Sequence, residues 1–240
     1  MEEMRRKMEE RVHLIRQQME EAARKAGRAP EEITLLAASK TQSAEIVALS
    51  AALPIDLFGE NRVQELVDKF DAGAYGGKQV DMIGHLQKNK VKYTVGRARL
   101  IHSVDSLELG QVISKEAGKK GLCQDILLEV NIGREESKSG VFPEELPRLL
   151  ENICQLPHIR VRGLMAIPPI SAKEGQNRPY FSALRQLFVD IKSKRYDNVH
   201  MDCLSMGMTH DYVDAILEGA TLVRIGTGIY GPRIYKEETP

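Results

Sequence analysis

Lys40 is the residue whose type and position first suggest chemistry. It follows residues 33–38, an apolar and partly β-branched stretch that is typical of a strand buried on both faces. Because lysine is rarely buried without a partner, Lys40 either points into a site or marks the exposed end of this strand. On this segment alone the second interpretation is favoured. In a site, its amine could attack a carbonyl group and form a Schiff base.

Two turns rich in small residues could bind a phosphate group. Ser205-Met206-Gly207 and Gly226-Thr227-Gly228 each combine glycine with a hydroxyl, and each follows an apolar segment late in the chain. In α/β barrels the turns after the last two strands often bind phosphate through backbone N–H groups. The alternative is that both are tight turns that need glycine for positive φ. Residues 226–231 also show G-x-G-x-x-G spacing, but the short remaining sequence makes a dinucleotide-binding unit unexpected.

Together, the lysine and the phosphate turns predict a site for a phosphorylated aldehyde. Pyridoxal 5'-phosphate (PLP) has both groups, so one molecule could join Lys40 and the two turns. Burial at a barrel mouth and the nearby cation Arg224 would lower the pKa of the lysine and favour its reactive free base. A Schiff-base aldolase that acts on sugar phosphates needs similar groups and remains the competing interpretation.

Eight apolar segments predict the strands that position these residues. The strands are expected at residues 33–38, 56–59, 79–84, 100–104, 125–132, 161–167, 200–204 and 221–225. Helices are expected at residues 1–26, 43–52, 61–70, a segment ending near 96, 106–119, 143–155, 180–194 and 210–218. This alternation predicts the α/β class, with one (β/α)8 TIM barrel domain over residues 1–240 and an extra N-terminal helix, residues 1–27, packed on it. A doubly wound open sheet is the alternative.

In such a barrel the ligand-binding residues gather where the strands end. The residues expected at this rim are Lys40, Asn61, His85, Asp105, Asn131, Met165, Ser205, Gly226 and Thr227. His85 could equally be a loop contact, and the other histidines show no metal-binding spacing. Residues 133–140 are polar and predict a mobile loop beside the rim.

Composition restricts the possible partners. The chain has 34 basic and 34 acidic residues, so binding to nucleic acid through bulk charge is not expected. Its three cysteines are far apart and suggest neither disulfides nor a zinc site, which fits a cytoplasmic protein. No stretch approaches the roughly 20 apolar residues of a membrane span. We therefore expect neither a metal site nor a membrane segment.

Several motifs resemble the pyridoxal phosphate homeostasis protein family. They are A-S-K-T ending at Thr41, F-G-E-N at 58–61, I-G-H-L-Q-K-N-K at 83–90, E-E-S-K-S-G-V at 135–141, R-G-L-M at 162–165, L-S-M-G-M at 204–208 and V-R-I-G-T at 223–227. The resemblance covers residues 33–233. The chain departs from the family pattern at Asp81-Met82, where a tryptophan is common, and at Arg62, where a tyrosine is common. The resemblance implies the fold-type III PLP-binding barrel of alanine racemases without their C-terminal β domain.

The resemblance also implies roles for individual residues. It implies that Lys40 holds PLP as a Schiff base and that Arg224 faces the pyridine nitrogen. It also implies that Ser205, Gly226 and Thr227 take the phosphate and that Asn61 and Met165 lie near the ring. Met206, Gly207 and His85 are further expected cofactor contacts. No catalytic residue is expected, because the β domain that supplies the second acid/base of racemases is missing.

The implied function is to buffer and deliver PLP and so maintain vitamin B6 and amino-acid balance. PLP-dependent apoenzymes are the expected recipients, and a monomer or weak homodimer is the expected assembly. The alternative is a weak amino-acid racemase or decarboxylase that uses Lys40 and PLP.

Overall fold

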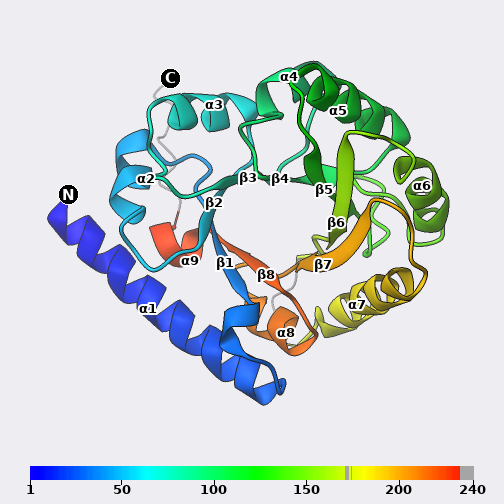
Figure 1. The fold of residues 1–240 in the computed structure, drawn as a ribbon. Coiled ribbons are helices and arrows are strands. Elements are labelled where there is room, and N and C mark those ends of the chain that lie inside the picture. Colours follow the sequence, from blue (N-terminus) through cyan, green and yellow to red (C-terminus); the bar gives the residue numbers. More distant parts are fainter. Residues whose placement is uncertain (171–172, 174, 233–240) are drawn as a thin grey trace.

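The computed structural model describes residues 1–170, 173 and 175–232, and in this part of the chain eight parallel strands form a closed barrel (Figure 1). The strands pair in chain order, and β8 closes the barrel by pairing with β1. They are β1 (Thr34–Ala38), β2 (Leu57–Glu60), β3 (Val80–Met82), β4 (Leu100–Val104), β5 (Gln124–Glu129), β6 (Ile159–Met165), β7 (Val199–Ser205) and β8 (Leu222–Ile225). The predicted TIM barrel is therefore confirmed.

Helices surround the barrel and connect its strands (Figure 1). The longer ones are α1 (Glu2–Lys25), α2 (Ala44–Ser50), α3 (Val63–Asp71), α5 (Leu107–Lys119), α6 (Leu146–Ile153), α7 (Arg178–Ser193) and α8 (Tyr212–Leu217). Short turns of helix are η1 (Pro30–Glu32), η2 (Lys88–Lys90), α4 (Val91–Thr94) and α9 (Thr227–Tyr230). The predicted N-terminal helix is α1, which packs outside the barrel against α8 and α9. In the described residues no helix is long and apolar enough to cross a membrane.

Local sequence explains where several helices begin. Ser43 accepts a hydrogen bond from the Ile46 N–H at the start of α2, and Ser106 accepts one from the Leu109 N–H at the start of α5. A serine in this position satisfies one of the backbone donors that the first helical turn leaves without a partner. Each cap therefore ends the preceding loop and directs the chain back along the outside of the barrel.

Side-chain alternation divides the barrel into an inside and an outside. Successive residues of a strand point to opposite faces. The larger buried cluster joins the outward-facing residues to the helices. The inward-facing residues form two smaller clusters, one of Leu36, Ala38, Leu57, Ile83 and Leu222 and one of Leu100, Leu127 and Met165. These apolar residues fill the barrel interior below its mouth.

Some predicted boundaries were wrong. The third strand is Val80–Met82 rather than residues 79–84, and the fifth ends at Glu129 rather than at residue 132. The predicted helix ending near residue 96 is a 3-10 turn followed by the four residues of α4. The helix α9 was not predicted, because four residues are too few for a helical period to be visible.

Candidate functional site

Lys40 and the turn after β8 lie at neighbouring strand ends. β1 pairs with β8 so that Ala37 is opposite Ile225. A Cβ atom on Gly226 would lie 3.2 Å from the Ala38 carbonyl oxygen, so the turn at Gly226 packs closely against the end of β1. The chain then reaches Lys40, which is half-buried, two residues after Ala38. The predicted lysine and one of the predicted phosphate turns are thus side by side.

The chain on either side of Lys40 is held by α3. Lys69 donates a hydrogen bond to the Ser39 carbonyl oxygen at 2.9 Å. The Thr41 N–H donates to Glu65 Oε2 at 2.7 Å, and Thr41 has the unusual φ of 66°. A non-glycine residue adopts such a conformation when its surroundings hold it there. These two contacts position the backbone of Lys40 at the mouth.

The turn after β7 lies beside β8 as well. The Arg224 N–H donates to the Gly207 carbonyl oxygen at 3.0 Å. Gly207 has φ of +91°, and a Cβ atom there would lie 2.5 Å from the Ala215 Cβ. This position therefore requires glycine for both its conformation and its space. The structure brings together the two predicted phosphate turns and Lys40.

Backbone donors of the two turns remain available. Among the described residues, no acceptor is found for the backbone N–H groups of Gly207, Gly226 and Thr227. The exposed Thr227 hydroxyl forms a hydrogen bond with the Thr209 hydroxyl at 3.2 Å. Backbone N–H groups of this kind suit an anion such as phosphate.

Met206 has a different position from its neighbours in the turn. Its side chain is fully buried in the outward-facing core, and its N–H donates to the Leu222 carbonyl oxygen at 3.2 Å. The structure therefore gives no support for the predicted contact between Met206 and a cofactor through its side chain or its N–H. Met206 instead packs the outer side of the barrel wall.

Buried polar side chains form a connected network inside the barrel, below the mouth. Asp81 accepts two hydrogen bonds from Arg99, at 2.9 and 2.5 Å, and lies 2.9 Å from His102 Nε2. His102 Nδ1 lies 3.0 Å from Ser205 Oγ. Arg224 donates to the same hydroxyl at 2.5 Å and to the Ala166 carbonyl oxygen at 3.0 Å. The network crosses the barrel from β3 to β8.

The network orients the Ser205 hydroxyl. The Asp81 carboxylate, ion-paired with Arg99, accepts a hydrogen bond from the N–H group at His102 Nε2. Burial lowers the pKa of His102, although its hydrogen bond with Asp81 acts in the opposite direction. The ring is therefore neutral, and its Nδ1 accepts a hydrogen bond from the Ser205 hydroxyl. In this arrangement Ser205 anchors Arg224 and does not direct its proton toward the mouth.

Arg224 is buried and lies in the field of an acid across the barrel. Burial lowers the pKa of Arg224 to about 10, whereas the charge of Glu129 acts to raise it. Glu129 ends β5, and burial together with the charge of Asp105 raises the pKa of its carboxyl to about 7. Arg224 therefore remains protonated at neutral pH, and Glu129 titrates near it.

Two of the other predicted rim residues, Asn61 and His85, line a cavity at the mouth. A cavity of about 310 Å³ is lined by Asn61, Ile83, Gly84, His85, Glu129, Val130, Ser137, Lys138, Ser139 and Ile167. Met165 is buried in the inward-facing cluster with Leu100 and Leu127. Asn61 and His85 thus face the same cavity, and Met165 lies in the apolar filling of the barrel.

Asn131 does not contribute a free side chain to the rim. Its amide nitrogen donates to the carbonyl oxygens of Glu135 and Lys138, and its side-chain oxygen accepts from the Glu135 N–H. Lys138 also contacts the Pro168 carbonyl oxygen and forms an ion pair with Glu135. The segment that was predicted to be a mobile loop is thus held by internal hydrogen bonds, and Asn131 is the residue that organises it.

A second buried cluster lies on the outside of the wall behind Lys40. Glu60 Oε1 accepts hydrogen bonds from Ser39 Oγ at 2.6 Å, Lys69 Nζ at 2.8 Å and Tyr75 Oη at 3.4 Å. Burial raises the pKa of Glu60, although its ion pair with Lys69 acts to lower it. This cluster ties β1, β2 and α3 together.

Of the residues in the two networks, only Ser205 and Arg224 were predicted as site residues. His102 was considered only as one of the histidines without metal-binding spacing, Asp81 was noted only as a departure from the family pattern, and Glu129 was not singled out. A usable signal existed, because His102 and Glu129 interrupt otherwise apolar strands. Among the described residues, no group of three or more histidine, cysteine or acidic side chains could hold a metal ion.

Comparison with known proteins gives consistent matches over nearly the whole chain. Residues 12–234 match the family model of the alanine racemase N-terminal domain. The chain is 44% identical over 226 residues to the pyridoxal phosphate homeostasis protein of Aquifex aeolicus, a match that covers 94% of this chain and 98% of that protein.

Solved structures show the same fold. PipY of Synechococcus elongatus PCC7942, solved with PLP bound, superposes with a TM-score of 0.80 at 29% identity, over 93% of this chain and 100% of that chain. The alanine racemase of Corynebacterium glutamicum superposes with a TM-score of 0.67 at 15% identity, over 94% of this chain and 62% of the racemase. The racemase match shows the shared barrel alone.

Proposed function

Because the chain belongs to the pyridoxal phosphate homeostasis protein family and to the alanine racemase N-terminal domain family, we propose that it binds PLP and supplies this cofactor to other proteins. The related PipY has a structure with PLP bound. The observation in this chain that supports the proposal most directly is the position of Lys40 beside the turn at Gly226 and Thr227. An amine and an anion-binding turn at neighbouring strand ends match the aldehyde and the phosphate of one small molecule.

The available donors fit the phosphate group. The N–H groups of Gly207, Gly226 and Thr227 would hold its oxygens, and the absence of a side chain on Gly226 lets the backbone approach closely. Ser205 would act one step away, by holding Arg224 through its hydroxyl. This is a refinement of the expected role of Ser205 as a direct phosphate ligand.

The residues below the mouth would receive the pyridine ring. Arg224 would face the ring nitrogen, and because a guanidinium keeps its proton, it would leave that nitrogen unprotonated. When bound, PLP supplies an electron-withdrawing ring whose strength depends on that nitrogen. Asn61, His85 and Met165 would line the remaining space around the ring.

Lys40 would hold the cofactor covalently as a Schiff base. The test is an absorbance spectrum of the purified protein with PLP before and after borohydride reduction, followed by mass mapping of the modified lysine. We expect a reducible chromophore in the wild type, modification at Lys40, and loss of both in Lys40→Ala. Lys138→Ala is the matched control, because Lys138 lies at the same mouth. Stable labelling of another lysine in the wild type would contradict the assignment.

The carrier role is distinguished from catalysis by turnover. A racemase or decarboxylase that used Lys40 would consume or invert single-enantiomer amino acids in the presence of PLP. We expect the loaded protein to show no sustained turnover and to pass its cofactor to PLP-dependent apoenzymes. Sustained turnover that Lys40→Ala abolishes would favour the enzyme.

A further inference from the structure

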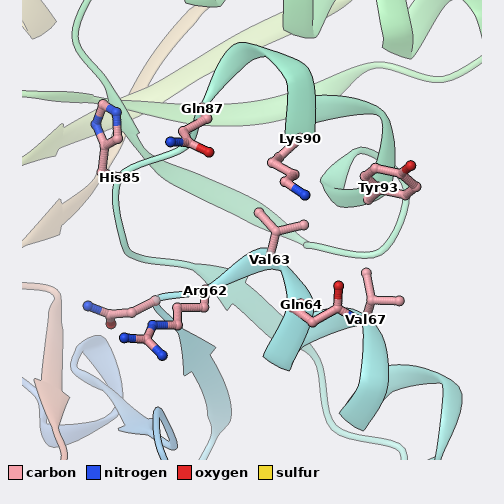
Figure 2. A pocket seen from close by; sticks show the side chains of 9 residues that line it. Arg62, Val63, Gln64, Val67, His85, Gln87, Lys90 and Tyr93 are labelled. Carbon is pink, nitrogen blue, oxygen red and sulfur yellow. The ribbon is translucent and has the colours of Figure 1, made fainter.

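A second groove lies beside the barrel mouth, between the start of α3 and the segment that contains η2 and α4 (Figure 2). Its volume is about 530 Å³, and it is lined by Asn61, Arg62, Val63, Gln64, Val67, His85, Gln87, Lys90 and Tyr93. Asn61 and His85 also line the cavity at the mouth. The groove therefore adjoins the proposed cofactor site.

The groove carries positive charge that the chain does not balance. Its lining contains Arg62 and Lys90 but no carboxylate. In the part of the chain that the structure describes, neither of these exposed cations forms an ion pair, and the same holds for the neighbouring Lys88 and Lys92. The whole chain has no net charge, so this is a local excess.

The nearby acids of α3 are already engaged. Asp68 accepts a hydrogen bond from Gln64 at 2.8 Å. Asp71 is paired with Arg97 at 3.3 Å, and Glu65 contacts Lys69 at 3.3 Å. None of them lines the groove. The acids of α3 therefore do not neutralise Arg62 and Lys90, and an anionic group of another molecule could pair with them.

The groove also has an apolar floor. Val63 and Val67 lie along α3, and the ring of Tyr93, which is 42% exposed, lies at one end. The Lys92 ammonium is 4.9 Å from the centre of this ring and the Lys90 ammonium is 6.0 Å from it. Cations next to apolar and aromatic surface suit a peptide that has both acidic and apolar side chains.

We propose that this groove docks an acidic segment of the protein that receives the cofactor. The inference rests on the proposed carrier function. In Figure 2 Arg62 and Lys90 lie on different sides of Val63 and do not converge on one point. Spread charges fit an extended chain with several carboxylates, whereas a single phosphate group needs donors that meet around it. Because the groove adjoins the mouth, a docked recipient would lie next to the cofactor site.

The first experiment measures peptide binding without cofactor. The probe is a fluorescein-labelled peptide of about twelve residues, glutamates with two leucines, followed by fluorescence anisotropy. The test variant is Arg62→Glu with Lys90→Glu. Its matched control is Lys192→Glu with Lys194→Glu, two exposed lysines at the end of α7 on the far side of the barrel, which in the described residues form no ion pair (Figure 1).

We expect the groove variant to bind the peptide at least about tenfold more weakly than the wild type, and the control variant to bind it within about twofold. Binding in the wild type should weaken steeply with added salt. Equal loss in both double variants, no detectable binding by the wild type, or displacement of the peptide by equimolar pyrophosphate would overturn the proposal. A milder pair, Arg62→Gln with Lys90→Gln, should show a smaller loss in the same direction and checks that folding is intact.

The second experiment measures transfer of PLP from the loaded protein to an apoenzyme with an acidic surface. We expect transfer from the groove variant to be at least about tenfold slower than from the wild type at low salt. Its PLP content and its release of PLP to a small reagent that captures free aldehydes should be unchanged. Unchanged transfer would overturn the docking role. Failure of the wild type to take up PLP would instead contradict the proposed function, so the two failures are distinguishable.

Discussion

The barrel wall separates two buried polar clusters that use similar residues differently. The outer cluster joins Ser39, Glu60, Lys69 and Tyr75 behind β1 and β2. The inner network joins Asp81, His102, Ser205 and Arg224 across the barrel interior. Both contain a buried acid, a buried cation and a serine hydroxyl.

The two clusters differ in how their hydrogen bonds are arranged. In the outer cluster three donors converge on one oxygen, Glu60 Oε1, and all members belong to neighbouring segments of the chain. The inner network ends at Arg224, below the mouth, where the charge of Glu129 acts on it and where Glu129 lines the cavity. We infer that the outer cluster stabilises the position of Lys40, and that the inner network prepares the surface on which a ligand would rest.

Removal of the outer cation would give the largest effect on stability. Lys69→Met leaves the Glu60 carboxylate buried without its ion-pair partner, and such a loss typically costs about 3–5 kcal/mol. We expect the free energy of unfolding in urea to fall by that amount. The double variant Lys69→Met with Glu60→Leu should recover most of the loss, because the uncompensated charge is then absent. A loss below about 1 kcal/mol in the single variant would show that the outer cluster does not hold the fold.

The pH dependence of stability tests the environment of Glu129, the acid that acts on Arg224 inside the barrel. Burial raises the pKa of Glu129 to about 7 from its ordinary 4.5. Between these values the unfolded chain loses this proton while the folded chain keeps it, so the contribution of Glu129 to stability falls as pH rises from about 4.5 to 7 and is constant above.

The variant Glu129→Gln has no carboxyl group to titrate at this position, so it does not lose stability through this group as pH rises. The stability of the variant relative to the wild type should therefore rise by about 3 kcal/mol between pH 4.5 and pH 8. Urea unfolding at a series of pH values measures this difference. A difference that does not change with pH would mean that Glu129 has an ordinary pKa in the folded protein.

Much of the fold could be predicted because its signals are local. Apolar strands and helical periods recur through the chain, and that alternation is sufficient for a barrel. The sequence also placed Lys40 and Gly226 at strand ends, and the pairing of β1 with β8 then makes them neighbours. The errors fell on short elements such as α4 and α9, whose four residues show no period.

The two polar clusters could not be predicted because their contacts are distant in sequence. His102 and Ser205 are 103 residues apart, and no local pattern reports their hydrogen bond. Lys69 has the appearance of a solvated lysine on a helix, yet it is 4% exposed. At β5 the predicted end was displaced, so Asn131 was chosen as the rim residue. Glu129, two positions earlier and with the same side-chain direction, is the residue that lines the cavity.

Ser205→Ala tests whether the inner network serves binding. The substitution removes the partner that holds Arg224 at 2.5 Å, while the Ala166 carbonyl oxygen still accepts from the same side chain. We expect the affinity for PLP, measured by absorbance titration, to fall about tenfold, which corresponds to roughly 1.4 kcal/mol. Unchanged affinity with lowered stability would assign this network a structural role like that of the outer cluster.

Tyr75→Phe sharpens the comparison from the other side and should have the smallest effect. Its hydroxyl makes the longest of the three bonds to Glu60, at 3.4 Å, while Lys69 and Ser39 stay in place. We expect the free energy of unfolding to fall by less than about 1 kcal/mol, and the affinity for PLP to stay within about twofold of the wild type, because the cluster lies outside the wall. A Tyr75→Phe protein that keeps its stability but binds PLP at least tenfold more weakly would show that the outer cluster acts on the site directly.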